Sequence, residues 1–138
     1  MVTVTNLQST YEGRQIKLVS VSLDPSQKSN RPAIFMDCGI HAREWVSPAF
    51  CIYTLDRLVE EGSSGLLNDF DIYLIPVANP DGYAYTWTGS RGRMWRKNRR
   101  PASMLLTKNV QTYQFWPNQG GFGGDFFFNF LFSKLKRL

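Results

Sequence analysis

Short apolar runs separated by polar loops are the main regularity of the first hundred residues. The pattern of Ile16, Leu18 and Val21 predicts a strand from about residue 15 to residue 22. Residues 33–36, Ala-Ile-Phe-Met, form a continuous apolar run. Such a run is typical of a strand that is buried on both faces, as in a parallel sheet.

The next segment has the spacing of a helix. Ser47 followed by Pro48 is a typical start, with Ser as the N-cap and Pro in the first turn. Gly62 suits the C-cap of the same helix. The face predicted to be buried contains Ile52, Leu55 and Val59 at helical spacing, with Cys51 and Leu58 flanking the same side.

A second apolar run, residues 71–78, predicts another buried strand, and Pro76 indicates a bulge or an edge position near its end. The strand, helix, strand order favours a right-handed crossover and a parallel pair of strands. Residues 79–82, Asn-Pro-Asp-Gly, are a strong turn signal, and the aromatic residues 83–87 suit a short extended piece. The predicted fold class is therefore α/β, with a partial mixed, mostly parallel sheet and flanking helices.

The pattern changes after Pro101. Residues 102–138 have no clean period, and they contain a glycine-rich stretch at 120–124 and a phenylalanine-rich run at 126–132. We therefore divide the chain into a domain at residues 1–101 and an unrelated tail at 102–138, which we expect to be poorly ordered. The sequence has no run that is apolar for long enough to span a membrane, and its first residues lack the features of a secretory signal peptide.

Composition adds one feature to this picture. The 138 residues suffice for a domain with a core, and the net charge of +5 is concentrated in one stretch. Its cations are Arg91, Arg93, Arg96, Lys97, Arg99 and Arg100. Arginine forks bind carboxylates and oxyanions, and arginine with tryptophan stacks on single-stranded nucleic acid. A solvated loop anchored by one tryptophan explains the same composition equally well.

The only histidine, His41, stands three residues before Glu44. If the backbone turns helically there, both side chains face the same side, and an imidazole nitrogen and a carboxylate oxygen converge like two ligands of a zinc ion. Such pairs are common by chance, but this one follows a buried strand, where α/β sheets gather ligands. A catalytic zinc site needs a third protein ligand, and the chain has no second histidine.

Cys38 and Cys51 are the only cysteines. Composition alone explains them equally well as buried small side chains or as a disulfide, and Cys38 as a metal ligand beside His41 is the less favoured alternative. A bridge would stabilise the fold by roughly 3 kcal/mol on the loop-entropy model. It would also imply an oxidising compartment.

Four motifs in order resemble one family. They are Tyr-Glu-Gly-Arg at 11–14, Gly-Ile-His-Ala-Arg-Glu-Trp at 39–45, Asn-Pro-Asp-Gly at 79–82 and Arg-Met-Trp-Arg-Lys at 93–97. Over about residues 8–101 their order and spacing resemble the zinc metallocarboxypeptidases of the carboxypeptidase A/B type, peptidase family M14. The resemblance implies the N-terminal part of a catalytic domain that is built on a mixed sheet with helices on both faces.

The resemblance implies a role for single residues. His41 and Glu44 would be the first two ligands of a Zn²⁺ ion, which activates water for attack on the last peptide bond of a substrate. Arg43 would bind the substrate backbone upstream of that bond. Arg96 would be both catalytic and substrate-binding, because it would polarise the scissile carbonyl and hold the developing oxyanion.

The resemblance also implies a cellular context. It predicts the disulfide between Cys38 and Cys51 that B-like members have, an extracellular location after secretion, and a monomer that acts on peptide or protein C-termini without nucleic acid or membrane as a partner. The family's third zinc ligand, Asn-Arg pair, mobile tyrosine and glutamate base belong to later motifs, which this sequence lacks. We therefore expect roughly the first third of a mature enzyme, without activity of its own.

Two alternatives to a truncated enzyme are kept open. The first is a non-catalytic remnant that holds a peptide through Arg43 and Arg96 without cleaving it. The second is a nucleic-acid-binding segment that uses residues 91–100 together with Trp87 and Trp95.

Overall fold

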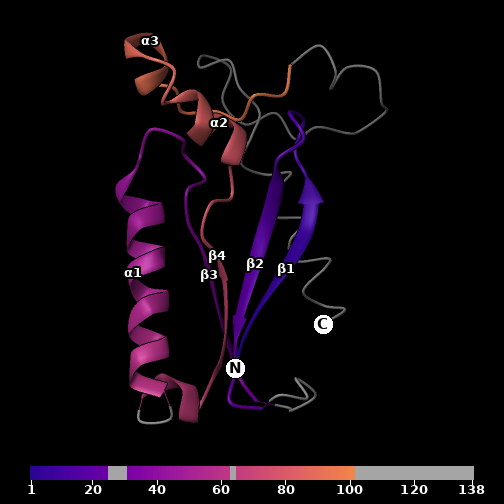
Figure 1. The fold of residues 1–138 in the computed structure, drawn as a ribbon, viewed down its shortest axis with the longest axis vertical. Coiled ribbons are helices and arrows are strands. Elements are labelled where there is room, and N and C mark those ends of the chain that lie inside the picture. The colour runs from indigo at the N-terminus through magenta and orange to yellow at the C-terminus, as the bar shows by residue number, and fades with distance from the viewer. Residues whose placement is uncertain (25–30, 63–64, 102–138) are drawn as a thin grey trace.

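The computed structural model describes residues 1–24, 31–62 and 65–101, and these form a sheet of four strands with one long helix on one face (Figure 1). The predicted tail at 102–138, with its glycine-rich and phenylalanine-rich stretches, lies outside the described residues. The strands are β1 (Val2–Ser9), β2 (Gln15–Val21), β3 (Ala33–Asp37) and β4 (Asp71–Ile75). The helices are α1 (Val46–Glu61), the short 3₁₀ helix η2 (Leu66–Asn68), α2 (Pro80–Tyr85) and α3 (Ser90–Arg93).

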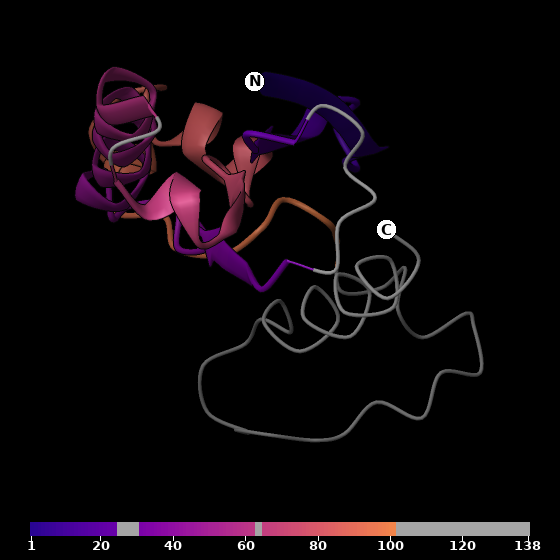
Figure 2. The same ribbon diagram turned by 90° about the horizontal axis from the view of Figure 1, so that it is seen from below.

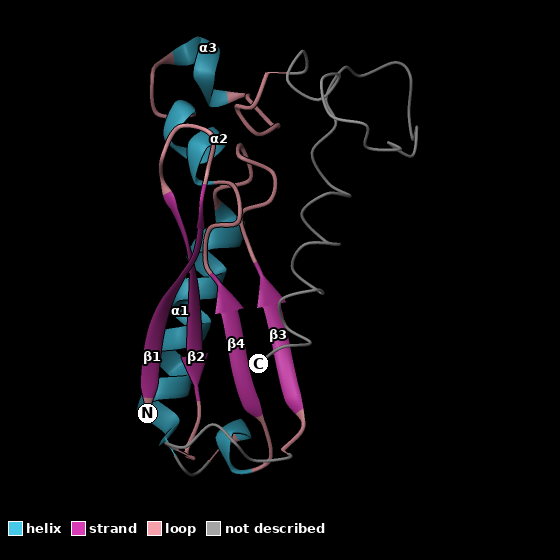
Figure 3. Cartoon of the chain, turned by 90° about the vertical axis from the view of Figure 1, so that its right-hand side faces the viewer, coloured by secondary structure: helices cyan, strands magenta, loops and turns pink. Residues whose placement is uncertain are grey.

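The strand order in this sheet is β1-β2-β4-β3 (Figure 3). β3 and β4 are parallel, as predicted, whereas β1 with β2 and β2 with β4 are antiparallel. The α/β class and the mixed sheet are confirmed, but the prediction of a mostly parallel sheet was wrong. β2 runs antiparallel to β4, and β1, which the predicted elements do not include, adds a second antiparallel pair. Its short connection to β2 can only make an antiparallel pair, because a parallel pair needs a long crossover.

The two strands predicted to be buried on both faces differ in the structure. β4 lies between β2 and β3 and is buried along nearly its whole length. β3 is at the edge of the described sheet and is only half-buried, so the prediction was wrong for this strand. β4 ends at Ile75, directly before Pro76, because proline has no N–H to donate to a neighbouring strand.

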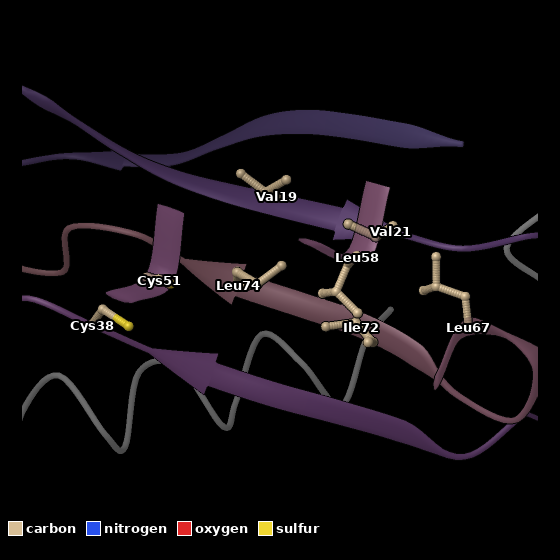
Figure 4. Close-up of a cluster of buried hydrophobic side chains, with 8 residues drawn as sticks. All are labelled: Val19, Val21, Cys38, Cys51, Leu58, Leu67, Ile72 and Leu74. Carbon is tan, nitrogen blue, oxygen red and sulfur yellow. The ribbon is translucent and has the colours of Figure 1, made fainter. Parts of the chain in front are cut away.

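The core between α1 and the sheet is built from alternate strand residues (Figure 4). Val19, Val21, Ile72 and Leu74 come from β2 and β4, and they pack with buried side chains of α1. When the molecule is seen from below, α1 lies on one side of the sheet (Figure 2). A second, smaller cluster contains Ile16, Leu18, Ile75 and Ala78.

The buried face of α1 is one residue out of phase with the predicted one. Cys51 and Leu58 are its centre, with 0% and 5% of their surface exposed, and Leu55 packs beside them. Ile52 and Val59 are each 53% exposed, so their predicted burial was wrong. The pattern permits both phases, because Cys51, Leu55 and Leu58 have the same helical spacing as the predicted set, and packing against the sheet selects one.

The start of α1 also differs from the prediction. Trp45 is the N-cap and makes no side-chain capping bond. Ser47 is inside the helix, and its hydroxyl accepts a hydrogen bond of 3.0 Å from the Gly39 N–H. It therefore ties the helix to the loop that follows β3. The predicted C-cap is confirmed, since Gly62 has a φ of 53° and its N–H donates to the Leu58 carbonyl.

The predicted turn at residues 79–82 is the start of α2. The Asn79 side chain caps the helix by accepting from the Gly82 N–H, and Pro80 occupies the first turn. The extended piece predicted at 83–87 was therefore wrong, because asparagine and proline begin helices as readily as turns. α2 and α3 lie beyond the carboxyl ends of β3 and β4 (Figure 3). Within the described residues, every helix falls short of the length and apolar content that crossing a membrane requires.

The phase of α1 can be tested with two neighbouring residues. Replacing buried Leu58 with alanine leaves a cavity, so Leu58→Ala should cost about 2–5 kcal/mol of unfolding free energy. Val59→Ala is the matched control, and because Val59 is mostly exposed its cost should stay below about 0.5 kcal/mol. Urea titrations followed by circular dichroism at 25 °C measure both values. Equal losses would show that the assigned face is wrong.

Candidate functional site

His41 and Glu44 lie in the turn between β3 and α1, at the carboxyl end of β3. The Glu44 N–H donates to the His41 carbonyl at 3.1 Å, so the chain between them turns as a helix does. His41 Nδ1 is 3.0 Å from one carboxylate oxygen of Glu44 and 3.1 Å from the other. The structure therefore brings together the two side chains predicted as metal ligands. Both are partly exposed, with 37% and 48% of the side-chain surface accessible.

Arg96 points at the same two groups. Its NH2 atom is 3.2 Å from His41 Nδ1, and its Nε atom is 4.0 Å from a Glu44 oxygen. The Nδ1 atom therefore has two possible partners: with a proton it donates to the Glu44 carboxylate, and without one it accepts from the Arg96 guanidinium, whose nitrogens only donate. In both cases Arg96 places a positive charge beside the Glu44 carboxylate.

The donor set suits a zinc ion in part. An imidazole nitrogen and a carboxylate are ordinary ligands of zinc, and here both direct acceptor atoms toward one point. Among the described residues, however, there is no group of three or more His, Cys, Asp or Glu side chains that could hold a metal ion. The described part of the chain thus offers two side chains of the kind that bind zinc and does not complete a zinc site.

Asn79 holds the loops around this turn in place. The pairing of β3 with β4 continues past the strands, as the Ala78 N–H donates to the Cys38 carbonyl at 2.7 Å. The side-chain amide of Asn79 then donates to the carbonyls of Ile40, at 3.2 Å, and Lys97, at 2.9 Å. Gly82 leaves room for these contacts, because a Cβ there would lie 2.5 Å from the Lys97 carbonyl oxygen.

A buried carboxylate joins two of the motifs on which the resemblance rests. Asp81 is 3% exposed and accepts from the Thr10 hydroxyl at 2.7 Å, the Glu12 N–H at 3.0 Å and the Arg14 guanidinium at 3.0 Å. The hydrogen bond from Arg14 to Asp81, and next the one from Arg14 to the Glu12 carboxylate at 2.6 Å, raise the pKa of Arg14. The turn between β1 and β2 is therefore fixed to the start of α2.

A cavity of about 290 Å³ lies beside His41. The β1–β2 turn, residues 78–81 and residues 96–100 line it, so one of its walls is basic. Arg99 in that wall is already paired, because its Nε is 3.2 Å from Glu12 and its guanidinium lies 3.9 Å from the centre of the Tyr85 ring.

Comparisons with known proteins agree with this arrangement. The family model described as zinc carboxypeptidase, peptidase M14, matches residues 1–133. The chain belongs to the zinc carboxypeptidase family. It is 46% identical over 100 residues to a carboxypeptidase B of Helicoverpa zea and 50% identical over 96 residues to human carboxypeptidase B. These matches cover 72% and 66% of this chain but 23% and 22% of the relatives, so the chain spans about a quarter of their length.

Solved structures of carboxypeptidases share the fold. Carboxypeptidase A of Helicoverpa armigera superimposes with a TM-score of 0.67 at 39% identity, over 73% of this chain and 24% of that one. Bovine thrombin-activatable fibrinolysis inhibitor, solved with a tick carboxypeptidase inhibitor, gives a TM-score of 0.63 at 42% identity, over 73% and 31% of the two chains. The sheet and helices described above are thus a fragment of the carboxypeptidase fold.

Arg43, the other residue predicted to bind substrate, has an exposed side chain and lies on the same turn as Glu44. Its backbone carbonyl accepts a hydrogen bond of 2.9 Å from Arg93. Sequence reasoning gave Arg93 no role of its own, although it begins one of the four motifs. Asn79 and Asp81 were assigned to a turn and to one of the four motifs but to no role of their own, because their contacts are with distant segments.

The two tryptophans of the nucleic-acid alternative each contact another aromatic ring, and Trp87 is 61% exposed. Trp87 stacks on Trp45 with ring centres 4.1 Å apart. Trp95 packs edge-on against Tyr85 at 5.3 Å, and its indole N–H donates to the Lys97 carbonyl. One face of Trp87 is thereby covered, which leaves less aromatic surface for stacking on bases.

The two cysteines are buried in the core cluster between α1 and the sheet, Cys51 on α1 and Cys38 directly after β3 (Figure 4). Both are unbonded in this structure, and the disulfide stays a prediction. Burial, followed by a hydrogen bond with Cys38, raises the pKa of the Cys51 thiol to about 12. A thiolate at position 51 is therefore strongly disfavoured in the folded chain.

This raised pKa predicts a loss of stability in alkali. Between the ordinary pKa of 9.0 and the folded value of about 12, the folded state of the reduced chain binds more protons than the unfolded state. The free energy of unfolding is therefore at its full value below pH 9 and falls as the pH rises toward 12. Between pH 8 and pH 10.5, urea titrations should show a larger fall in the free energy of unfolding for the reduced chain than for Cys51→Ala. An equal fall in both would contradict the raised pKa of Cys51.

Proposed function

We propose that this chain carries part of the metal and substrate site of a secreted, monomeric zinc carboxypeptidase, which hydrolyses C-terminal amino acids from peptides and proteins. The supporting observation is the convergence of His41 Nδ1, the Glu44 carboxylate and the Arg96 guanidinium at the carboxyl end of β3. His41 and Glu44 would hold Zn²⁺. When bound, zinc would supply an activated water and polarise the scissile carbonyl.

Arg96 has the properties of a group that stabilises negative charge. Its side chain is 50% exposed, so a substrate can reach it, and its backbone is held by the bond from the Ala42 N–H to its carbonyl at 3.1 Å. Guanidinium N–H groups aimed at a carbonyl oxygen bind it more tightly as that oxygen becomes anionic. Arg96 would therefore orient the scissile carbonyl and hold its developing charge, while Arg43 would bind the peptide backbone upstream.

The part of the site that this chain supplies limits what it can do alone. Two ligands bind a dication more weakly than three, and the sequence has no second histidine to add. The family's general base, a glutamate that would activate the zinc-bound water, also belongs to later motifs that this sequence lacks. The proposed activity therefore belongs to a complete domain, and the chain alone would bind zinc without cleaving peptides.

Zinc binding is the direct test of the two ligands. We expect isothermal titration of the purified chain with Zn²⁺ to show weak 1:1 binding, which falls at least about tenfold in His41→Ala and in Glu44→Ala. Glu60→Gln removes an exposed carboxylate of α1 and is the matched control, which should bind like the original chain. Equal affinities of His41→Ala and Glu60→Gln would refute the proposed ligand pair.

Activity can be tested separately on N-acylated dipeptides that end in arginine or in phenylalanine. We expect no release of the C-terminal residue by the chain above the level of His41→Ala, at any zinc concentration. Zinc-dependent release that His41→Ala abolishes would show that two ligands suffice. Peptide binding without release, weakened by Arg96→Ala, would support the non-catalytic remnant instead.

A further inference from the structure

Arg93 contacts both neighbours of Glu44. Its NH1 atom donates to the Arg43 carbonyl at 2.9 Å, and its guanidinium carbon lies 3.9 Å from the centre of the Trp45 ring. Arg43 and Trp45 are the residues directly before and after Glu44. We propose that Arg93 is a positioning residue for the turn that carries His41 and Glu44, and that it acts by holding the Arg43 carbonyl and the Trp45 ring on either side of Glu44.

Trp45 is a firm support for this contact. Its indole N–H donates to the Thr86 hydroxyl at 2.8 Å, and Thr86 is only 2% exposed. Trp87 stacks on Trp45 at 4.1 Å with the rings inclined by 10°. A guanidinium and an indole at such short distances occupy opposite faces of the ring, so Trp45 is held between Arg93 and Trp87. A cation–π contact of this kind is attractive, because the face of the indole ring carries negative charge density.

A second contact joins the same two segments. The Ala42 N–H donates to the Arg96 carbonyl at 3.1 Å, beside the bond from Arg93 to the Arg43 carbonyl. The chain from Arg93 to Arg96 is thereby fastened at both ends to the turn from Ala42 to Trp45. The segments joined in this way are the ones whose side chains converge at His41 Nδ1. Without the Arg93 contact, the Ala42–Arg96 bond and the Asn79 amide would still join the segments, but the turn would lose its support at Arg43.

This inference rests on the proposed function for its meaning, since a positioned carboxylate matters where a metal is bound. Groups that orient a metal ligand change affinity by about 10–100-fold when they are removed, although they do not touch the metal. Arg93 differs from Arg43 and Arg96 in this respect, because its proposed partners are protein groups and not substrate.

Amide hydrogen exchange tests the positioning role without any metal. In Arg93→Ala, the amides of Ala42 and Glu44 should exchange on the order of tenfold faster, because the turn opens locally. The β4 amides of Ile72 and Leu74 should be unchanged. Arg91→Ala, an exposed cation of the same helix α3, is the matched control and should leave all four amides unchanged.

Zinc titration of the same variants gives the second measurement. We expect Arg93→Ala to bind about tenfold more weakly, with Arg93→Lys between it and the original chain, since lysine keeps the charge but loses the planar fork. Faster exchange without zinc binding by the original chain would refute the proposed function and support the positioning role. Unchanged exchange at Ala42 and Glu44, or an equal increase at Leu74, would overturn the positioning role whether or not zinc binds.

Discussion

The side-chain amide of Asn79 is the interaction on which the arrangement of the site depends. It donates to the carbonyl of Ile40 in the loop after β3 and to that of Lys97 in the basic segment, residues 91–100. It also accepts from the Gly82 N–H at the start of α2. Asn79 can reach all three because β3 and β4 run parallel, so both loops leave the sheet at the same edge. His41 and Arg96, which are far apart in the sequence, meet as a result.

The charges of the site follow from this backbone frame. The Nδ1 atom of His41 and the Glu44 carboxylate lie 3.0 Å apart on a partly exposed turn. The Arg96 guanidinium lies beside both, 3.2 Å from Nδ1 and 4.0 Å from a carboxylate oxygen. A metal ion bound by His41 and Glu44 would therefore compete with the positive charge of Arg96 for the same carboxylate.

Local patterns predicted the central parts of the fold and failed at its margins. The apolar runs were sufficient for β3, β4 and their parallel pairing, and the three-residue spacing was sufficient for the convergence of His41 with Glu44. Ile52 and Cys51 show the limit, because adjacent residues can both begin an apolar stripe, and only packing against β2 and β4 decides between them. Ser47 and Asn79 show a second limit, since short polar side chains suit several backbone positions, and distant partners select one.

The absence of a Cβ atom at Gly82 sets the spacing between the turn that carries His41 and the segment that carries Arg96. At Gly82, an added methyl group would lie 2.5 Å from the Lys97 carbonyl oxygen, 2.5 Å from the Asn79 amide and 2.8 Å from the Ala42 methyl group. Those three atoms belong to the basic segment, to the loop after β4 and to the turn between His41 and Glu44. Even an alanine at position 82 would force these segments apart, and the Arg96 and His41 side chains that they carry would separate with them. The absence of a side chain at Gly82 therefore determines how closely the guanidinium can approach the imidazole.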